Sequence, residues 1–598
     1  MSMEKRWVLK QYGNEGLVEK LAQDLQVDKT CTRPEDFEVY KIIANLLVQR
    51  GINNYDDAKK FFRPNINDLH DPFMLNDMDE AVERIMFAIK GGEKILVYGD
   101  YDVDGTSAVA LVYSYLELFH PEIDFYIPDR YEEGYGVSYK AIDWAYENGF
   151  KLIICLDCGI KAIDQVAYSL ERGIDFIIAD HHLPDEELPN ACAILNPKRI
   201  DSTYPYKELS GCGIGFKLIH ALNIKRRKPF DALIPYLDLV AIAIAADIVP
   251  ITGENRILAF YGLKVINKQP RPGLEAILKY SKVVHVIDTF TNKLYFNKEL
   301  NLSDLVFLIC PRINAAGRIE TGNSSVELLI AKKLEEAEEI AKKINNNNDT
   351  RKEFDNQATE EAIEMIRNSN DLETSKATVA YKDDWNKGVV GIVASRLIEQ
   401  FYRPTIVFTK SNNLITGSAR SVKNFDIYSA IESCSHLLTH FGGHKFAAGL
   451  SLKEENLEEF IKLFKQKVGE NISEDQSSPE IEIDDSITLS TITPKLNRVL
   501  KQFAPFGPEN NIPIFQSDNV VDTGNIRPVG QKHLKLSVIH LDISHLPFSC
   551  IGFGLSNYYE EIRHGEAFNI AFHIDENEWN GKTSLQLNIK DIKLNNKQ

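Results

Sequence analysis

The chain has 598 residues, of which 44% are hydrophobic and 26% charged, so a single core and an intrinsically disordered protein are both excluded. The net charge of −19 argues against a polyanionic partner, unless carboxylates that surround metal ions account for part of the excess. Eight cysteines do not suggest a disulfide framework, and the N-terminus has no apolar signal segment. The lack of a disulfide framework favours a reducing cytoplasm, and no apolar run is long enough to span a bilayer, so we expect no membrane contact.

The first half of the chain predicts a helical extension followed by an α/β domain. Residues 1–70 have mostly helical patterns. The segments 94–100, 151–157 and 175–180 are continuous apolar runs, which are typical of strands buried on both faces. Helical spacing between them, as in residues 105–119, indicates a parallel, doubly wound sheet.

The second half predicts a long connecting helix, another α/β domain and a small closed β-barrel. The connecting segment is highly charged, and it contains a run of four asparagines. Short alternating strands follow an acidic linker and predict the barrel. The predicted parts are an N-terminal helical extension, a catalytic α/β domain, the connecting helix, a second α/β domain, and a linker with the barrel, at residues 1–70, 71–324, 325–370, 371–469 and 470–598.

Acidic residues stand at the ends of three successive predicted strands. Ligands bind outside the carboxyl ends of the strands in such sheets, so we expect these side chains to converge. Residues two apart in an extended chain face the same side, which would bring the aspartates after the first strand together. The residues are Asp100, Asp102 and Asp104 after the first strand, Asp157 after the second, and Asp180, His181 and His182 after the third.

This combination of side chains predicts a site for divalent cations. Carboxylates and imidazole suit Mg²⁺ or Mn²⁺, and four or more carboxylates are enough for two ions about 3.5–4 Å apart. Such a pair ionises water and clamps a phosphoryl oxygen during in-line displacement, with Asp157 as the candidate shared ligand. The alternative is that aspartates at strand ends cap helix N-termini, which explains one of them more readily than the whole set.

Four motifs, GDYDVDG, LDCGI, ADHH and AIAADIVP, resemble in order and spacing those of the DHH phosphoesterase superfamily. Further segments, PRINAAGRI, GVVGIVASRL, GSARS and FGGHKFAAGL, are similar to the RecJ branch, the single-strand-specific DNA exonucleases. The resemblance covers nearly the whole chain. It implies a DHH catalytic domain, a DHH-associated domain that faces the metal centre across a cleft, and a C-terminal OB-fold barrel.

The resemblance also implies roles for the acidic cluster and its histidines. Asp102 and Asp104 would bind different ions, and Asp157 would bridge them. His181 and Asp247 would complete the second metal site.

The resemblance places two further residues beside these ligands. His182 would lie close to the scissile phosphate, and Asp180 would support the histidines. Small pyrophosphatase-like members have a histidine where this chain has Tyr98, and Asp100 is expected to compensate as an additional metal ligand.

Candidate phosphate contacts come from both sides of the implied cleft. The paired glycines of FGGHKFAAGL allow backbone amides to approach an anion closely. Arg130 is expected either to hold a terminal phosphate or to form a structural ion pair. The candidate substrate-binding residues are Arg130, Arg312, Asn314, Arg318, Arg396, Ser418, Arg420, Gly442, Gly443 and His444.

Three other patterns have ordinary structural explanations. Cys155 and Cys158 have the spacing of a redox or zinc-ligand pair, but the end of a buried strand favours structural cysteines. The glycines of SGCGIGFKL superficially resemble a dinucleotide loop, and in the resembling family this stretch begins a helix near the catalytic core. His436, His440 and His444 are spaced like ligands on a helix that a Gly-Gly pair would interrupt.

The predicted barrel is acidic, with 17 Asp and Glu against 11 Lys and Arg from residue 471 onward. Single-strand binding by an OB-fold requires a positive groove with stacking aromatics. Phe553, Tyr558, Tyr559 and Phe568 are candidates for stacking on bases, although phenylalanines in a small barrel are usually core.

The main hypothesis is a metal-dependent exonuclease that degrades single-stranded DNA from the 5′ end to mononucleotides, in DNA repair and recombination. Polarity and the preference for DNA follow from the resemblance. The expected partners are single-stranded DNA, a helicase and a single-strand-binding protein, and we expect a monomer. The alternatives are a nuclease for short RNA or a phosphatase for nucleotides, and a non-catalytic scaffold at the replication fork.

Overall fold

The computed structural model describes residues 4–26, 34–130, 132–287, 294–319, 322–540, 547–579 and 582–595. The chain divides into two compact units. One unit joins residues 1–68 and 250–252 to residues 480–598, and the other contains residues 69–249 and 253–479. Among the described residues, no helix has the length and apolar character needed to cross a membrane.

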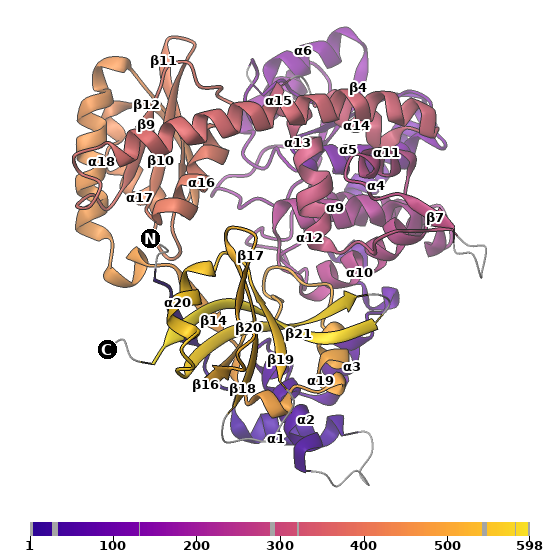
Figure 1. Cartoon of the computed structure of the whole chain (residues 1–598). Coiled ribbons are helices and arrows are strands. Elements are labelled where there is room, and N and C mark those ends of the chain that lie inside the picture. The colour runs from indigo at the N-terminus through magenta and orange to yellow at the C-terminus, as the bar shows by residue number, and fades with distance from the viewer. Residues whose placement is uncertain are drawn as a thin grey trace. The chain divides into compact units, whose positions relative to one another are not determined.

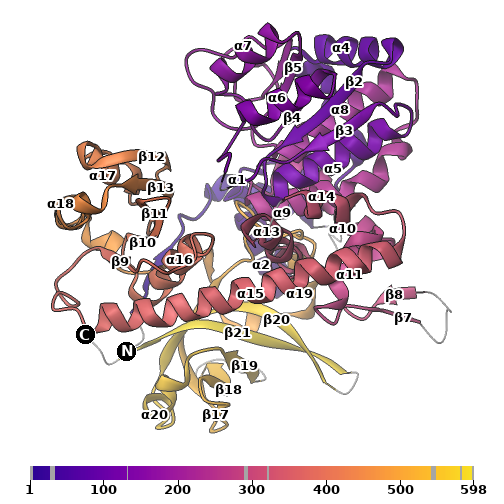
Figure 2. The same cartoon turned by 90° about the horizontal axis from the view of Figure 1, so that it is seen from above.

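The larger unit begins with a five-stranded parallel sheet in the order β3-β2-β4-β5-β6. Its strand β4 is labelled in Figure 1, and β2, β3 and β5 are labelled in Figure 2. Helices α4, α5 and α8 pack on one face, and α6 and α7 pack on the other. The predicted doubly wound parallel sheet is therefore confirmed. Its strands are β2 (Lys94–Gly99), β3 (Ile123–Tyr126), β4 (Phe150–Leu156), β5 (Asp175–Ala179) and β6 (Ala193–Leu195). The helices are α4 (Met78–Gly91), α5 (Val103–Glu117), α6 (Tyr139–Glu147), α7 (Ile163–Glu171) and α8 (Gly211–Lys225).

A buried helix, α9 (Leu237–Asp247), packs against α5 and α8 and carries Asp247 at its last position. Every residue of α9 from Leu237 to Ala245 is buried, which explains why this segment is apolar all round. Asp247 therefore stands where a buried helix ends.

A single helix of 34 residues, α15 (Leu334–Arg367), connects the two sheets of this unit (Figure 2). Its rise of about 1.5 Å per residue gives a length of about 50 Å. Near its start it contacts α11 (Pro272–Lys279) and α13 (Cys310–Ile319), and it also contacts α16 (Val390–Phe401). The asparagine run 345–348 continues the helix, and Asn348 is buried. The sequence predicts a connecting helix over 325–370, and in the structure α14 (Asn323–Ile330) precedes α15 there.

The second sheet has five strands in the order β12-β13-β11-β10-β9, with only β9 and β10 parallel. The helical interpretation of His436, His440 and His444 is wrong, because the last two lie on an extended strand. The strands are β9 (Thr378–Tyr381), β10 (Thr405–Ser411), β11 (Leu414–Arg420), β12 (Leu438–His444) and β13 (Ala447–Leu452). Helices α17 (Ile427–Glu432) and α18 (Leu457–Asn471) complete this part with α16.

The smaller unit contains a five-stranded ring of β-strands. Strand β16 pairs with β18 and β20, β19 pairs with β18 and β21, and β20 pairs with β21, so the ring closes as expected for the OB-fold. Phe568 is buried in its core, whereas Phe553 is exposed. The strands are β16 (Phe515–Asp522), β18 (His533–His540), β19 (Phe548–Gly552), β20 (Phe568–Trp579) and β21 (Lys582–Leu594).

The N-terminal segment packs with this barrel in one hydrophobic core. Helices α1 (Glu15–Leu25), α2 (Pro34–Val48) and α3 (Tyr55–Phe62) contribute buried residues to it. Strand β1 (Arg6–Leu9) pairs in parallel with β14 (Glu480–Ile483). The two ends of the chain thus build a single unit, which local sequence patterns do not show.

Candidate metal centre and the facing cavity

The chain turns directly from β2 into α5, and this turn carries the first aspartates. Asp102 is the N-cap of α5, and its Oδ1 accepts a hydrogen bond from Gly105 N at 3.0 Å. Asp100 is buried, and its Oδ1 has no hydrogen-bond partner among the described residues. The expectation of an extended Asp100–Asp104 stretch is wrong, because Asp104 already lies in the first helical turn. Asp102 is a helix cap as well as a candidate ligand, so the two interpretations are compatible.

Asp104 is held by the start of α8. Its Oδ2 accepts a hydrogen bond from Gly211 N at 2.7 Å, and its Oδ1 accepts one from Cys212 N at 2.8 Å. Ser210 caps this helix by accepting a hydrogen bond from Gly213 N. These two backbone hydrogen bonds from a helix N-terminus hold the Asp104 carboxyl group in place, facing the cluster.

Asp157 follows β4 in a left-handed backbone conformation with φ of 60°. It is buried, and its Oδ1 has no hydrogen-bond partner among the described residues. A Cβ at Gly211 would lie 2.4 Å from that oxygen, so only glycine at this position leaves room for the carboxylate. The glycine that resembles part of a dinucleotide loop in sequence thus makes space for a candidate metal ligand.

His181 lies between two carboxylates. Its Nε2 is 3.3 Å from Asp157 Oδ1 and 3.5 Å from Asp247 Oδ2. Neither ring nitrogen makes a hydrogen bond with a described residue, although the side chain is almost fully buried. An imidazole buried without a hydrogen-bond partner is costly, so a site for a cation is the simplest explanation for this arrangement.

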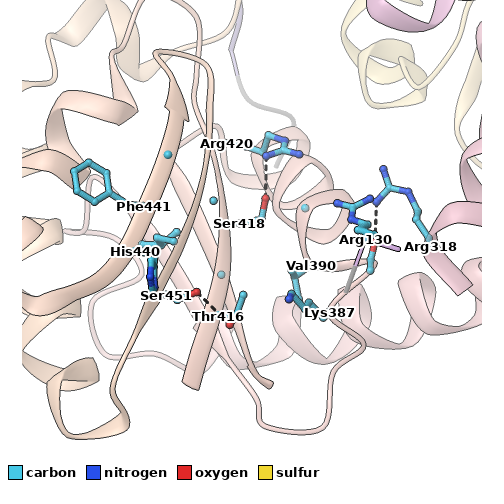
Figure 3. Close-up of a pocket in the computed structure, with 16 residues that line it drawn as sticks. Arg130, Arg318, Lys387, Val390, Thr416, Ser418, Arg420, His440, Phe441 and Ser451 are labelled. Atoms are coloured by element: carbon cyan, nitrogen blue, oxygen red, sulfur yellow. Dashed lines mark hydrogen bonds between the residues drawn. The ribbon is translucent and has the colours of Figure 1, made fainter. Parts of the chain in front are cut away.

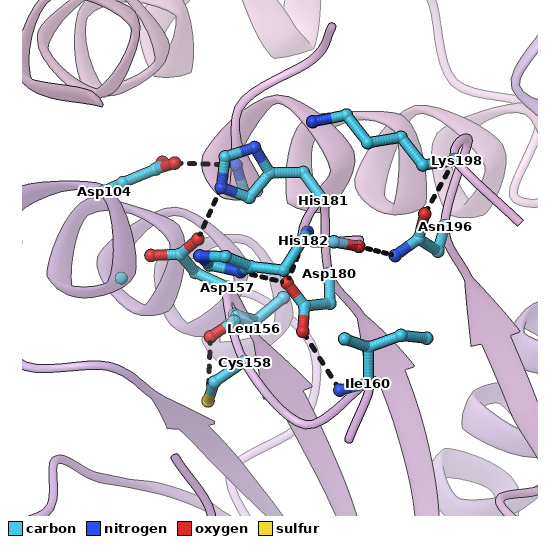
Figure 4. Close-up of polar contacts among 12 residues, drawn as sticks. Asp104, Leu156, Asp157, Cys158, Ile160, Asp180, His181, His182, Asn196 and Lys198 are labelled. Carbon is cyan, nitrogen blue, oxygen red and sulfur yellow. Dashed lines mark hydrogen bonds and ion pairs between the residues drawn. The ribbon is translucent and has the colours of Figure 1, made fainter. Parts of the chain in front are cut away.

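His182 is fixed from several sides, as Figure 4 shows. Its Nδ1 lies 2.7 Å from Asp180 Oδ1, and its backbone oxygen accepts a hydrogen bond from Asn196 Nδ2 at 2.9 Å. The other oxygen of Asp180 accepts a hydrogen bond from Ile160 N. Burial, the largest single effect, lowers the pKa of His182, but the hydrogen bond and charge of Asp180 together with the charges of Asp247 and Asp104 outweigh it, so that pKa is raised. Asp180 therefore orients the imidazole and stabilises its cationic form.

The residues present fit divalent cations. Three groups of side chains have ligand atoms within 4.8 Å of one another. Four candidate ligand atoms have no hydrogen-bond partner among the described residues. They are one buried oxygen each of Asp100 and Asp157, and both ring nitrogens of His181. Oxygen with imidazole suits Mn²⁺ or Mg²⁺. The groups are Asp157, His181 and His182; Asp104, His181 and Asp247; and Asp100, Asp102 and Asp157.

The electrostatics of the cluster lead to the same conclusion. Burial, followed by repulsion from Asp247, raises the pKa of Asp104 to about 7. Burial and repulsion from Asp102 raise the pKa of Asp247 to about 7. Burial also raises the pKa of Asp157 well above its usual range, with Asp104 as the largest repelling charge. Cations would replace protons on these carboxylates, so metal binding would restore their ionised forms.

A cavity of about 410 Å³ lies within the same unit and is lined by both α/β parts (Figure 3). Arg130, Arg318 and Lys387 line it together with the second sheet. Arg318 Nη1 donates a hydrogen bond to Gly388 O at 2.7 Å, which fixes its guanidinium at the wall. From the second sheet, Ser418 Oγ accepts a hydrogen bond from Arg420 Nη1 at 2.9 Å. The cavity therefore offers several cationic and hydroxyl groups to an anion.

Several candidate substrate-binding residues lie at or next to this cavity. Arg130, Arg318, Ser418, Arg420 and Gly442 line it. Its lining thus contains five of the ten residues that the sequence suggested.

The second-sheet hairpin carries two more of the ten residues beside Gly442. Gly443 has φ of 145°, and a Cβ there would lie 2.4 Å from Ala447 O, so the close strand contact requires glycine. The pKa of His444 is lowered first by burial and then by the nearby charges of Arg420 and His182. His444 is therefore close enough to both to share their field.

Besides Gly443 and His444, three candidate residues do not line the cavity. Arg312 is buried, and it donates hydrogen bonds to Leu308 O at 2.5 Å and Asn345 Oδ1 at 3.2 Å. Arg396 pairs with Asp355 at 2.8 Å on α15. Asn314 lies on α13, half-buried. The contacts of Arg312 and Arg396 are those of residues that attach α15 to its neighbours.

Sequence reasoning missed Asn196, Lys387 and Tyr135. Asn196 follows β6, so the rule that polar residues end the strands would have found it. Tyr135 lies in the loop after β3, and its hydroxyl is 3.2 Å from His182 Nε2. No local pattern marks Lys387, which reaches the site only through the packing of the two α/β parts.

Three family models match the chain in order. They are the DHH family N-terminal domain over residues 94–244, the DHHA1 domain over residues 374–470 and the RecJ OB domain over residues 483–591. The crystal structure of RecJ in complex with Mn²⁺ from Thermus thermophilus matches with a TM-score of 0.80 at 23% identity, covering 98% of this chain and 79% of that one. The expected succession of domain folds is confirmed.

Two curated relatives extend over most of the chain. The single-stranded-DNA-specific exonuclease RecJ of Bacillus subtilis (strain 168) is 37% identical over 568 residues, which are 94% of this chain and 69% of the relative. The exonuclease of the same name from Escherichia coli (strain K12) is 32% identical over 593 residues, which are 95% of this chain and 98% of the relative. With this identity over nearly the full length of the E. coli protein, the chain belongs to the RecJ family of single-stranded-DNA-specific exonucleases.

Proposed function

We propose that this chain is a metal-dependent exonuclease that hydrolyses single-stranded DNA from the 5′ end to mononucleotides. The observation that carries the proposal is the buried cluster of carboxylates and His181, whose ligand atoms lack partners among the described residues. The 5′ polarity, the mononucleotide product and a setting in DNA repair and recombination are part of the proposal. A complete ligand set disfavours a non-catalytic scaffold.

Mn²⁺ or Mg²⁺ would be held as two ions by the acidic cluster. Asp157 and His181 each belong to two of the three ligand groups, and Asp157 is the proposed shared ligand because its carboxylate has two oxygens to offer. When bound, the ions supply an ionised water and neutralise charge on the phosphate. The remaining proposed metal ligands are Asp100, Asp102, Asp104, His181 and Asp247.

His182 is proposed to act on the scissile phosphate. Because Asp180 engages Nδ1, a protonated His182 presents its Nε2–H to the substrate side, where Tyr135 now lies 3.2 Å away. That N–H can donate a hydrogen bond to a phosphate oxygen as negative charge develops there. Asp180 holds the ring in the required orientation throughout.

The cavity with Arg130, Arg318, Ser418 and Arg420 is proposed to hold the 5′-terminal phosphate. Arginine suits phosphate because its planar fork donates two parallel hydrogen bonds. Anchoring the end of the strand at a fixed distance from the metal centre would make the enzyme cut one nucleotide at a time. Strand selectivity would follow if the space between the two α/β parts accepts one strand and not a duplex.

Digestion of end-labelled oligonucleotides with Mn²⁺ tests these points. We expect single strands labelled at the 5′ end to release labelled mononucleotide at once, and 3′-labelled strands to release it last. Equal rates on single strands and duplexes would contradict the selectivity argument. For Asp157→Ala we expect hydrolysis to fall by at least about 100-fold while DNA binding persists, because a shared ligand holds both ions. Loss of folding in that variant would indicate a structural role.

The proposed substrate also implies other participants. Single strands arise where duplexes are opened, so a helicase and a single-strand-binding protein are proposed as suppliers of substrate in the cytoplasm. A monomer is proposed, because both parts of the candidate site come from one chain. Light scattering would test the oligomeric state, and a stable dimer would contradict it.

A further inference from the structure

A second cavity, of about 230 Å³, has His182 in its lining. Its walls come from the loops that follow β3 and β4, and from the start of α7. It therefore lies at the carboxyl ends of the strands, where doubly wound sheets bind ligands. The residues that define it are Tyr135, Val137, Ile160, Ala162, Gln165 and His182.

The loop that carries Tyr135 is shaped for this position. Gly134 and Gly136, on either side of Tyr135, have φ of 85° and 86°, in the region that favours glycine. Tyr98, fully buried on β2, donates a hydrogen bond from its hydroxyl to Gly136 O at 2.7 Å. The loop is thus tied to the sheet, and Tyr135 as a whole residue remains 59% exposed beside the cavity.

The lining combines apolar side chains with the side-chain amide of Gln165, and Lys161 and Asp180 also line it. Val137, Ile160 and Ala162 are buried aliphatic side chains, and Tyr135 adds an aromatic wall. The side-chain amide of Gln165 makes no hydrogen bond with any described residue and can both donate and accept. A flat heteroaromatic ring with hydrogen-bonding groups on its edge matches this surface. A cavity of about 150 Å³ takes a benzene ring, so the volume here suits one nucleobase.

The position next to His182 indicates which nucleotide of the substrate would place its base in this cavity. Tyr135 Oη is 3.2 Å from His182 Nε2, so a ring beside Tyr135 is attached to a nucleotide whose phosphate is near His182. We propose that this cavity is a subsite for one unpaired nucleobase of the two nucleotides joined by the scissile phosphodiester. The inference rests on the proposed nuclease function and adds a base contact to it.

Such a subsite has a consequence for strand selectivity. A base must leave its stack to enter a pocket, and a paired base must also break its hydrogen bonds. Duplex DNA would therefore be disfavoured at the metal centre itself, in addition to any exclusion by the width of the cleft. The contact need not read sequence, because stacking on an aromatic side chain accepts every base.

Oligonucleotides with a single abasic nucleotide test the subsite. The rate of release of the first nucleotide would be measured with the abasic residue at the first, second or a remote position. For the wild-type enzyme we expect a loss of about 10- to 100-fold in kcat/KM at the first or the second position, which is the range that base–aromatic stacking supplies. The remote position should have little effect.

Ala162→Leu fills the cavity, and Ala167→Leu is its matched control on the exposed side of α7. The Ala162→Leu enzyme should cut an intact strand as slowly as the wild-type enzyme cuts the abasic strand. An abasic residue should then cause no further loss of rate in this variant. Ala167→Leu should behave like the wild type. If Ala162→Leu does not fold, Gln165→Ala should show a reduced abasic penalty instead.

Two results would overturn the inference. One is a wild-type enzyme that cuts single strands but is indifferent to abasic residues at the first two positions. The other is a folded Ala162→Leu or Gln165→Ala enzyme that keeps the full abasic penalty. A wild-type enzyme with Mn²⁺ that cuts no oligonucleotide would instead overturn the proposed function, and this inference with it.

Discussion

A methyl group at position 211 is expected to disable the metal centre and leave the fold intact. In Gly211→Ala, the new Cβ would lie 2.4 Å from Asp157 Oδ1 and 2.5 Å from Asp157 Cβ, whereas ordinary contact begins at 3.4 Å. The carboxylate must therefore move by about 1 Å, and a displacement of that size can cost about 100-fold in rate. Ligand distances in metal sites tolerate only about 0.2 Å, so Mn²⁺ affinity should also fall sharply.

Gly213→Ala is the matched control for this change, two residues further along α8. Its Cβ would meet Leu209 and Ser210 at 3.5 Å, which is ordinary contact, and alanine favours the helix by about 0.5–1 kcal/mol. Calorimetric titration with Mn²⁺, single-strand digestion and thermal melting would be run on both variants. The reasoning is refuted if Gly211→Ala melts like the wild type and still binds Mn²⁺ and cuts DNA normally.

Three further predictions use the same structure. Arg420→Ala should weaken single-strand binding and reduce the slope of log affinity against log salt concentration by about 0.7 per lost phosphate contact, as measured by anisotropy titrations at several salt concentrations. Arg312→Ala should instead leave binding unchanged and lower the free energy of unfolding in urea by about 1–3 kcal/mol. Removing divalent cations with a chelator should lower the melting temperature by about 5–10 °C relative to Mn²⁺ at 100 times its Kd, as measured by scanning fluorimetry; an unchanged melting curve would contradict the metal assignment. Lys217→Met leaves the buried Glu254 with hydrogen bonds from His70 N and Tyr204 but without its ion-pair partner. It should cost about 3–5 kcal/mol in urea unfolding, a loss that Glu254→Gln in the same chain should partly restore.

The sequence predicted the parallel sheet and the convergence of the acidic residues because both follow from local order. Continuous apolar runs alternating with helices leave little choice of topology, and aspartates at strand ends must meet at one edge. The detailed orientation was not predictable. Asp102 and Asp104 point where they do because α5 starts within the motif, and because the backbone of α8 reaches Asp104 from more than a hundred residues away.

Long-range packing accounts for what sequence reasoning could not find. Lys387 lines the cavity although no local pattern marks it, whereas Arg312 does not line it although it lies in the motif PRINAAGRI. The difference is that Arg312 donates hydrogen bonds to Leu308 O and Asn345 Oδ1 among the neighbouring helices. The pairing of β1 with β14 is equally invisible locally, since its two strands are separated by more than four hundred residues.

The overall charge of −19 is compatible with a polyanionic substrate because the distribution of charge decides the field at short range. Among the described residues that line the larger cavity, the charged groups are Arg130, Arg318, Lys387 and Arg420, and no carboxylate is present. At physiological ionic strength the screening length is about 8 Å, so acidic groups elsewhere on the surface contribute little there. The carboxylates nearest the reaction are those of the metal cluster, and two divalent cations would offset four of their charges. Affinity for DNA should therefore depend on salt with a slope set by these few cations, rather than by the net charge of the chain.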